Sequence, residues 1–282
     1  MPELPEVETV MRGLTPHLQG QIIQSVTTNR KDLRIPFPKD LKKQLEGKTV
    51  IHLKRRAKYI LITLEDSNVM IVHLGMSGRV EIIEKKEHYS KDKHDHLILE
   101  LQNGTKIVYN DPRRFGMIFT VPEEGLEQHK SFSSLGPEPL GNQFSAAYLK
   151  EKLSGKTQSI KQAIMDQRIV VGVGNIYACE ALYKAGIHSE KKAHQVSLKK
   201  LEALVVAIRQ VLKKAIDAGG STLNDYRQAD GSLGYFQHQF TVYDREGELC
   251  RSCKKDGYKQ PCIQRIVQSG RSTYYCSRKQ KK

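Results

Sequence analysis

Hydrophobic positions at the start of the chain recur at the spacing of an amphipathic helix. The apolar side chains that fall on one helical face are Val7, Val10, Met11, Leu14 and Leu18. Gly20 follows them and is a typical helix end. Pro2 and Glu3 therefore lie just before the N-terminus of the predicted helix, where the helix dipole stabilises negative charge.

From about residue 48 to residue 120 the pattern changes to short runs rich in β-branched residues. The predicted strands are residues 49–53, 59–64, 69–73, 79–83, 97–101, 106–109 and 117–121. Turn-forming sequences separate them, among them residues 66–68 and 103–104. This pattern predicts an antiparallel β-sandwich or barrel.

A breaker-rich segment, residues 135–139, precedes a helical region. The predicted helices are residues 146–153, 160–166, 175–185 and 198–218. Residues 221–235 are polar and without a clear period, and they predict a mobile loop. The tail returns to β character at residues 240–243, 263–268 and 272–275, with Gly270 at the turn. The chain thus predicts an α+β fold in three parts, residues 1–134, 135–239 and 240–282.

Composition adds a charge bias to this picture. The 282 residues include 46 Lys and Arg against 31 Asp and Glu, a net charge of +15. Such an excess favours a polyanionic partner, although a basic protein without one would show it too. No stretch approaches the roughly 18 apolar residues of a membrane span, and the first 30 residues lack a secretory signal. We therefore expect a cytoplasmic protein that binds nucleic acid rather than membrane.

Four of the five cysteines cluster near the C-terminus and predict a metal site. Cys250 and Cys253 form a C-x2-C pair, while Cys262 and Cys276 flank the predicted hairpin at its open end. A structural zinc would stabilise a hairpin that is marginal by itself. Ordinary free thiols are the alternative. Cys179 lies on an apolar helical stretch and fits a small core residue.

Pro2 is a candidate nucleophile. An initiator Met before a small residue is normally removed, which would leave a secondary amine beside the carboxylate of Glu3. An α-amino group has a pKa of about 7.7–8.0, so part of it is unprotonated near neutral pH. Its attack on a sugar carbon gives a charged iminium, which acts as an electron sink. The alternative is that Pro2 is only a terminal residue and Pro5 a helix-start proline.

Motifs along the whole chain resemble those of the formamidopyrimidine-DNA glycosylase family, bacterial repair enzymes for oxidised purines. The segments that carry the resemblance are residues 2–6, 55–59, 73–78, 93–96, 111–116, 171–177 and 270–273. They follow one another in the family's order from the first residues to the last. The sister family, endonuclease VIII, differs in the opening motif, and Leu4 favours the purine-directed branch.

The resemblance implies a bifunctional DNA glycosylase and abasic-site lyase that flips an oxidised purine, 8-oxoguanine or a formamidopyrimidine, out of the duplex. Pro2 would attack the sugar C1′ and Glu3 would act as the general acid/base. The iminium acidifies the C2′ protons, and β,δ-elimination then nicks the strand. Lys58 and Arg271 would assist elimination near the phosphates, although both also fit solvated turn residues. Glu6 would play a supporting role in the first helical turn.

The resemblance also implies the DNA contacts. Met76, Arg113 and Phe115 would fill the void that the flipped base leaves, whereas without the resemblance Met76 and Phe115 would be taken as core residues. The expected phosphate contacts are His94, Lys156, Lys161 and Asn175. Residues 221–235 would cover the flipped base.

The implied architecture is an N-terminal β-sandwich with flanking helices, a helix–two-turn–helix domain and a zinc-finger hairpin. The implied protein is a monomer that binds double-stranded DNA with oxidised bases or abasic sites, and it holds one structural Zn2+. The family usually closes its zinc site with a second C-x2-C pair, but Lys279 stands at the last position here. We expect Cys262 to replace the missing ligand. A same-fold enzyme for oxidised pyrimidines and a non-catalytic zinc-finger protein that binds distorted DNA are the alternatives.

Overall fold

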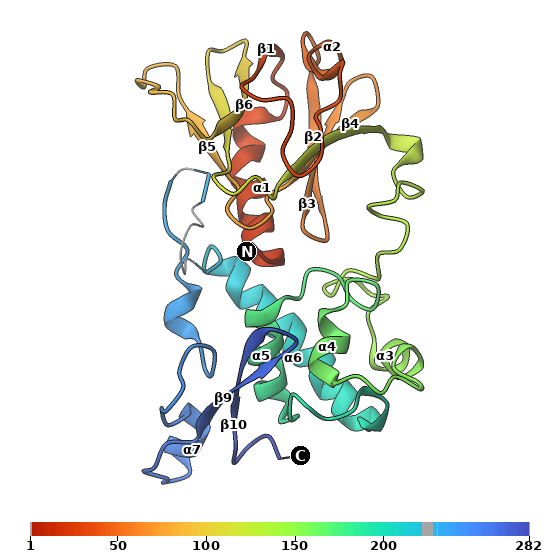
Figure 1. Ribbon diagram of the computed structural model, residues 1–282, viewed down its shortest axis with the longest axis vertical. Coiled ribbons are helices and arrows are strands. Elements are labelled where there is room, and N and C mark those ends of the chain that lie inside the picture. Colours follow the sequence, from red (N-terminus) through yellow and green to blue (C-terminus); the bar gives the residue numbers. More distant parts are fainter. Residues whose placement is uncertain (1, 222–227, 230, 282) are drawn as a thin grey trace. The chain divides into compact units, whose positions relative to one another are not determined.

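The computed structural model describes residues 2–221, 228–229 and 231–281, which form two compact units. The first comprises Met1–Ser133 and Ile216–Tyr235, and the second comprises Ser134–Ala215 and Phe236–Lys282. Figure 1 shows the strands of the first unit and the helices of the second. The three-part division of the chain stays a prediction. Residues 222–227 and 230 of the predicted loop lie outside the described residues.

The first unit is built on two antiparallel four-stranded sheets. One sheet has the order β1 (Ile23–Thr28), β6 (Asp95–Leu101), β7 (Lys106–Asn110) and β5 (Arg79–Ile83). The other has the order β2 (Val50–Arg56), β3 (Tyr59–Leu64), β4 (Asn68–His73) and β8 (Met117–Pro122). The predicted β-sandwich is confirmed, and seven of these strands overlap the seven predicted from the apolar pattern.

The apolar pattern misses β1 and the helix α2 (Leu41–Leu45). In β1 only Ile23 and Val26 are buried, because it is an edge strand whose polar residues face solvent. The five residues of α2 are too few to show a helical period.

Helix α1 (Leu4–Leu18) packs against β2, β3 and β5, and therefore against both sheets. Its predicted apolar face is buried among the sandwich side chains at Val7, Val10, Leu14 and Leu18. Glu3 and Glu6 form a reciprocal capping box that closes the first turn. The sandwich core thus fixes the helix whose N-terminus carries Pro2.

The second unit contains α3 (Ala146–Lys152), α4 (Ile160–Met165), α5 (Asn175–Ala185) and most of α6 (Leu198–Asp217). Ser145 and Ser159 cap α3 and α4 through their hydroxyl oxygens. Short 3-10 helices are η1 (Glu123–Gly125) in the first unit, and η2 (Ala193–Gln195) and η3 (Phe236–Gln239) in the second. The four predicted helices agree with the structure to within one residue at each end.

A short helix, α7 (Arg251–Lys255), and the hairpin of β9 (Ile263–Gln268) and β10 (Arg271–Cys276) complete the second unit. In Figure 1 the hairpin lies beside α5, against which β10 packs. The hairpin is confirmed, but the predicted strand at residues 240–243 is wrong.

Glu180 on α5 explains why residues 240–243 form no strand. Its buried carboxylate accepts hydrogen bonds at 2.9–3.0 Å from the backbone N–H groups of Thr241, Val242 and Tyr243. A strand needs a neighbouring strand to bond these groups, and here a single side chain does so instead. The apolar pattern of the segment reflects burial against α5 rather than sheet pairing.

Candidate functional site

Pro2 and Glu3 are both buried at the N-terminus of α1. The Glu3 backbone N–H donates to Glu6 Oε2 at 2.8 Å, and Glu6 Oε1 accepts from the backbone N–H of Ser221 at 2.8 Å. Glu6 is itself only 2 % exposed. It therefore ties the proposed catalytic end of the chain to the start of the segment 221–235, a link that the sequence alone does not reveal.

Lys58 lies in the two-residue turn between β2 and β3 and is 9 % exposed. Ala57 precedes it with a φ of 54°, a left-handed conformation that is unusual outside glycine. Arg55 holds this turn, because its Nη1 donates to the Ala57 carbonyl at 2.9 Å while its Nε donates to Glu8 Oε2 at 2.8 Å. Glu8 is part of α1, so the turn with Lys58 is fastened to the helix that carries Pro2 and Glu3.

His73, the last residue of β4, is a neutral acceptor at neutral pH. Burial, followed by the positive charges of Lys58 and Arg34, lowers the pKa of His73 to about 4. The Gly75 backbone N–H donates to His73 Nδ1 at 3.1 Å. This bond requires an unprotonated Nδ1, and it sets the start of the loop that carries Met76.

The three proposed void-filling residues are exposed on two loops of the first unit. Met76 is 38 % exposed in the β4–β5 loop, and Phe115 is 43 % exposed in the β7–β8 loop. Arg113 is exposed in the same loop as Phe115, and its guanidinium carbon lies 5.0 Å from the centre of the Phe115 ring. These side chains are therefore available to a ligand, unlike the core residues that apolar character alone would suggest.

The predicted phosphate contacts lie in different environments. His94 is half-buried just before β6, where its backbone N–H donates to Asp92 Oδ1 at 2.7 Å. Lys156 is half-buried in the α3–α4 connection. Asn175 opens α5 after the turn that ends in Gly174. Each of these positions leaves part of the side chain accessible.

Lys161 is different, since it is 1 % exposed. Its Nζ donates at 2.6 Å both to Asn175 Oδ1 and to Thr273 Oγ1. Asn175 Nδ2 in turn donates to the Ser272 carbonyl at 2.9 Å. Lys161 thus joins α4 and α5 to β10, whose exposed first residue is Arg271. A pocket of about 150 Å³ lies between α4 and the tip of the hairpin. It is lined by Lys161, Gln162, Met165, Asp166, Gln268, Ser269 and Arg271.

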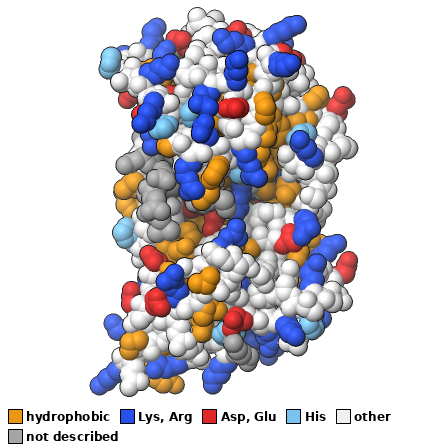
Figure 2. All heavy atoms as spheres, viewed as in Figure 1, with side chains coloured by type: hydrophobic (Ala, Val, Ile, Leu, Met, Phe, Trp, Pro, Cys, Tyr) orange, Lys and Arg blue, Asp and Glu red, His pale blue; other side chains and the backbone are white. Residues whose placement is uncertain are grey.

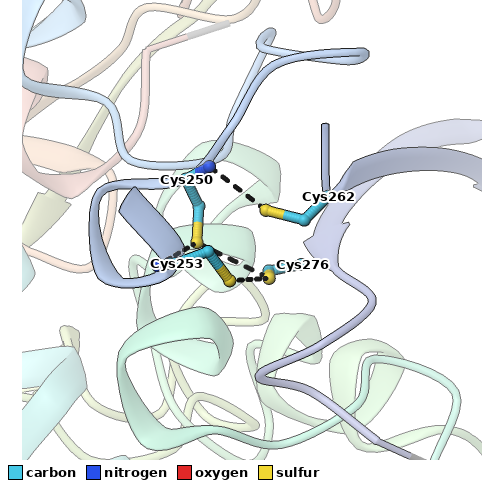
Figure 3. A group of neighbouring side chains, drawn as sticks. All are labelled: Cys250, Cys253, Cys262 and Cys276. Atoms are coloured by element: carbon cyan, nitrogen blue, oxygen red, sulfur yellow. Dashed lines mark hydrogen bonds between the residues drawn. The ribbon is translucent and has the colours of Figure 1, made fainter. Parts of the chain in front are cut away.

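The four C-terminal cysteines are buried and converge from α7 and the hairpin, as Figure 3 shows. Their sulfur atoms all lie within 4.8 Å of one another. Cys276 Sγ is 3.5 Å from Cys250 Sγ and 3.6 Å from Cys253 Sγ. A tetrahedral site with bonds of about 2.3 Å needs sulfur atoms about 3.8 Å apart. Cys250, Cys253, Cys262 and Cys276 can therefore hold a metal ion.

Hydrogen bonds prepare one of these thiols for ionisation. Burial opposes ionisation of Cys250, but hydrogen bonds from the Tyr183 hydroxyl and the Cys253 backbone N–H bring its pKa down to about 7. Burial raises the pKa of Cys276 well above its usual value. The Lys279 amine forms an ion pair with Asp256.

Positive side chains are spread over the surface. Figure 2 shows Lys and Arg on the visible face of both units, in keeping with the net charge of +15. Among the described helices, none combines the length and the apolar character needed to cross a bilayer.

Comparison with known proteins extends over the whole chain. Residues 1–118 match the formamidopyrimidine-DNA glycosylase N-terminal domain, and residues 135–227 match the formamidopyrimidine-DNA glycosylase H2TH domain. The formamidopyrimidine-DNA glycosylases of Ruegeria pomeroyi and Rhodospirillum rubrum are each 49 % identical, and each alignment covers 100 % of both chains.

Solved structures of the Lactococcus lactis Fpg protein are also similar. A complex of one variant with DNA that contains Fapy-dG has a TM-score of 0.89 and 34 % identity, and covers 100 % of both chains. A complex with DNA that contains an abasic site has the same TM-score and identity, and covers 99 % of this chain and 100 % of that one.

Proposed function

Because the chain belongs to the formamidopyrimidine-DNA glycosylase family, we propose that it removes oxidised purines from double-stranded DNA and nicks the abasic site that results. The observation that carries this proposal is the full-length similarity to such enzymes together with the buried Pro2–Glu3 pair at the head of α1. The substrates are duplexes with 8-oxoguanine, formamidopyrimidines or abasic sites.

Pro2 acts as the nucleophile after Met1 has been removed. Its nitrogen forms a bond to the sugar C1′ as the C1′–N bond to the base breaks, and the base leaves with a proton. After the amine has lost its proton, the nitrogen lone pair forms the C1′=N bond of an iminium as the C1′–O4′ bond breaks and the ring oxygen takes a proton. Glu3, whose position the Glu6 carboxylate fixes through the Glu3 N–H, supplies and removes these protons.

Strand cleavage follows from the same iminium. It acidifies the C2′ protons, so loss of one proton expels the 3′ phosphate, and a second elimination expels the 5′ phosphate. Lys58 lies in a turn that Arg55 and Glu8 hold against α1, and it serves as a proton donor or phosphate contact in these steps. Arg271 serves near the 5′ phosphate from the exposed tip of the hairpin.

The remaining site residues hold the DNA open and in register. Met76, Arg113 and Phe115 fill the space that the flipped base leaves, since all three are exposed on loops. His94, Lys156 and Asn175 contact phosphates. Lys161 was expected to do the same, but its burial favours an indirect role in which it positions Asn175 and β10.

The cysteine cluster holds one zinc ion through Cys250, Cys253, Cys262 and Cys276. Four thiolates are the donor set that structural zinc prefers, and their sulfur spacing fits a tetrahedron. The ion supplies folding free energy to the hairpin and keeps Arg271 in place. Cys262 then replaces the ligand that the family places at the position of Lys279.

We propose a separate role for each of the three parts of the sequence. Residues 1–134 carry the chemistry, residues 135–239 form the helix–two-turn–helix domain, and residues 240–282 form the zinc-finger hairpin. The resemblance to the family supports a monomer. The proposed DNA substrate supports a location in the cytosol of a bacterial cell.

Cleavage of defined lesion duplexes tests the proposal. Untagged protein is incubated with duplexes that hold 8-oxoguanine, an oxidised pyrimidine or an abasic site, with and without borohydride, which reduces the iminium to a stable adduct. We expect nicking and a covalent adduct with 8-oxoguanine, and neither with Pro2→Gly or with an N-terminally tagged form. Absence of an adduct with the untagged protein would contradict the lyase mechanism.

The oxidised pyrimidine duplex addresses the second candidate function. One solved structure of the Lactococcus lactis protein contains DNA with an oxidised pyrimidine, which supports a test of such substrates for this chain. Faster cleavage of that duplex than of the 8-oxoguanine duplex would favour the pyrimidine-directed reading.

A further inference from the structure

Two loops of the first unit carry the proposed void-filling side chains, and both are exposed. The β4–β5 loop carries Met76, and the β7–β8 loop carries Arg113 and Phe115. Since core packing does not fix these side chains, their positions depend on the backbone of the loops. A misplacement of about 1 Å in such a site can lower a rate by about 10²-fold. The loops therefore need a rigid connection.

The two loops approach each other backbone to backbone. Gly75 has a φ of +63°, and a β-carbon added to it would lie 2.4 Å from the carbonyl carbon of Phe115. A β-carbon added to Gly116 would lie 1.7 Å from the hydroxyl oxygen of Tyr109. A side chain at position 75 would collide with the backbone at Phe115, so the two loops are in direct contact there. A side chain at position 116 would collide with Tyr109 of β7, which anchors the second loop to the sheet.

One buried carboxylate lies at this contact and bonds to both loops. Asp111 is 0 % exposed, and its Oδ1 accepts from Ser77 Oγ at 2.6 Å. Its Oδ2 accepts from the Gly116 N–H at 2.8 Å and lies 3.4 Å from the Tyr109 hydroxyl. Ser77 Oγ in turn accepts from the Arg113 N–H at 3.1 Å. Asp111 and Ser77 thus join the loop after β4 to the backbone on both sides of Phe115.

The partners of Asp111 suit a buried charge. A carboxylate removed from water needs several donors, and a charged acceptor makes each bond stronger than a neutral one would. Burial raises the pKa of Tyr109 well above its usual value, and the Asp111 charge adds to this, so the hydroxyl remains a donor. His96 Nε2 lies 2.9 Å from the Asp111 carbonyl oxygen and fastens the backbone at the same residue.

We propose that Asp111 and Ser77 form a lock that fixes the Met76 loop and the Arg113–Phe115 loop in one arrangement, so that both enter the base stack together. The inference rests on the proposed function, because it concerns the base-flipping step of that reaction. Asp111 and Ser77 are 0 % and 4 % exposed, so they are positioning residues and not DNA contacts.

Loss of the lock should affect some substrates more than others, whereas a general loss of stability should affect all of them equally. The lock contributes only when a stacked duplex has to be opened and its void filled. A lesion opposite a spacer without a base lacks an orphaned partner to hold, and less of its stack has to be disrupted. Loss of the lock should therefore slow excision opposite cytosine much more than excision opposite the spacer.

The test compares Asp111→Ala, Ser77→Ala and Asp111→Asn with Ile23→Val, a core change in β1 with no bond to either loop. Asn keeps one acceptor oxygen, so it should retain part of the lock. The substrates carry 8-oxoguanine opposite cytosine or opposite a spacer, with 2-aminopurine beside the lesion to report unstacking. Single-turnover excision rates and stopped-flow fluorescence are measured, and circular dichroism checks folding.

We expect Asp111→Ala and Ser77→Ala to slow excision opposite cytosine by about 10- to 100-fold. Their fluorescence rise should be lost, while excision opposite the spacer should change by less than about threefold. Asp111→Asn should be intermediate, and Ile23→Val should match the wild type. If Asp111→Ala does not fold, Ser77→Ala carries the test. A folded Ser77→Ala protein with wild-type rates and fluorescence, or with equal losses on both substrates, would overturn the inference.

Failure of the proposed function gives a different result. Wild-type protein would then excise neither substrate, whatever the state of the lock. The fluorescence comparison still decides the inference in that case. A wild-type rise that Ser77→Ala loses supports the lock, and the absence of a wild-type rise overturns it.

Discussion

The β-sandwich of the first unit and the hairpin of the second are stabilised in different ways. An apolar cluster that includes side chains of α1 and of both sheets fills the sandwich. The hairpin of β9 and β10 shares a much smaller cluster, in which four of the nine buried members are the converging cysteines. A two-stranded hairpin is marginal in water without further support. We therefore expect the sandwich to form by apolar burial alone, and the hairpin to depend on the proposed metal and on polar contacts with α4 and α5.

This difference matches the proposed tasks of the two regions. The residues proposed for chemistry, Pro2, Glu3 and Lys58, belong to the first unit, which has the large apolar core. Arg271, which is proposed to assist a late step, is on the hairpin that the proposed metal would stabilise. The chemistry is thus expected to survive damage to the hairpin better than the late phosphate contact does.

Removal of the proposed metal should cause the largest difference in stability between the hairpin and the sandwich. Structural zinc contributes roughly 10 kcal/mol or more to small domains. Chelation, or Cys276→Ser, should expose the backbone amides of residues 263–276 to hydrogen exchange while those of β3 and β4 stay protected. Cys179→Ala, which alters a buried cysteine outside the four ligands, should leave the hairpin protected. Protection of β9 and β10 in metal-free protein would contradict the account.

Glu180→Ala should have the next largest effect, confined to the second unit. It removes the acceptor of three backbone N–H groups at residues 241–243, and a charged hydrogen bond contributes about 1.5–3 kcal/mol. We expect the free energy of unfolding of metal-loaded protein in urea to fall by about 3 kcal/mol. Glu202→Ala, at an exposed position of α6, is the control and should change it little. An unchanged transition for Glu180→Ala would show that this carboxylate does not hold the segment.

Lys161→Met and Arg271→Ala should separate a positioning role from a phosphate contact. Both should weaken binding to lesion DNA. Loss of a phosphate contact lowers the slope of log Kobs against log salt by about 0.9, so Arg271→Ala should reduce the slope and Lys161→Met should not. Titrations at several salt concentrations measure this. An equal reduction for Lys161→Met would mean that its amine reaches a phosphate after all.

The pH dependence of the sandwich should show an effect that appears only in acidic solution. The pKa of His73 is about 4 in the folded protein, against an ordinary value of 6.5. As the pH falls below about 6.5 the unfolded chain binds a proton that the folded protein does not, so stability is lost between these two values. His73→Gln should remove this contribution, and urea unfolding at pH 7 and at a pH between the two values checks it. If wild type and variant lost stability with the same pH dependence, that loss would come from titratable groups other than His73.

The elements that the sequence predicts well are those in which apolar residues are frequent. The strands β3 and β5 and the helix α5 have the bounds that their apolar pattern predicts. The pattern fails at β1, whose buried positions are few, and at residues 240–243, whose backbone bonds to Glu180 on a distant helix.

The candidate site likewise has residues that the sequence indicates and contacts that it does not. The sequence alone indicates Pro2 and the four clustered cysteines as candidates, and the resemblance to a family adds Lys58. The bonds that position them join residues far apart in sequence, such as Arg55 with Glu8 and Asp111 with Ser77. Such pairs carry no local signal, so only the structure reveals them. The burial of Lys161 likewise carries no local sequence signal.

The central claim is that the amine of Pro2 forms the covalent bond to DNA. The most direct measurement is peptide mapping, by mass spectrometry, of the borohydride-trapped adduct between untagged protein and an 8-oxoguanine duplex. The account predicts that the reduced sugar is attached to the peptide that begins with Pro2, and that this peptide lacks Met1. Attachment to a lysine, Lys58 in particular, or an adduct of undiminished yield with Pro2→Gly, would contradict it.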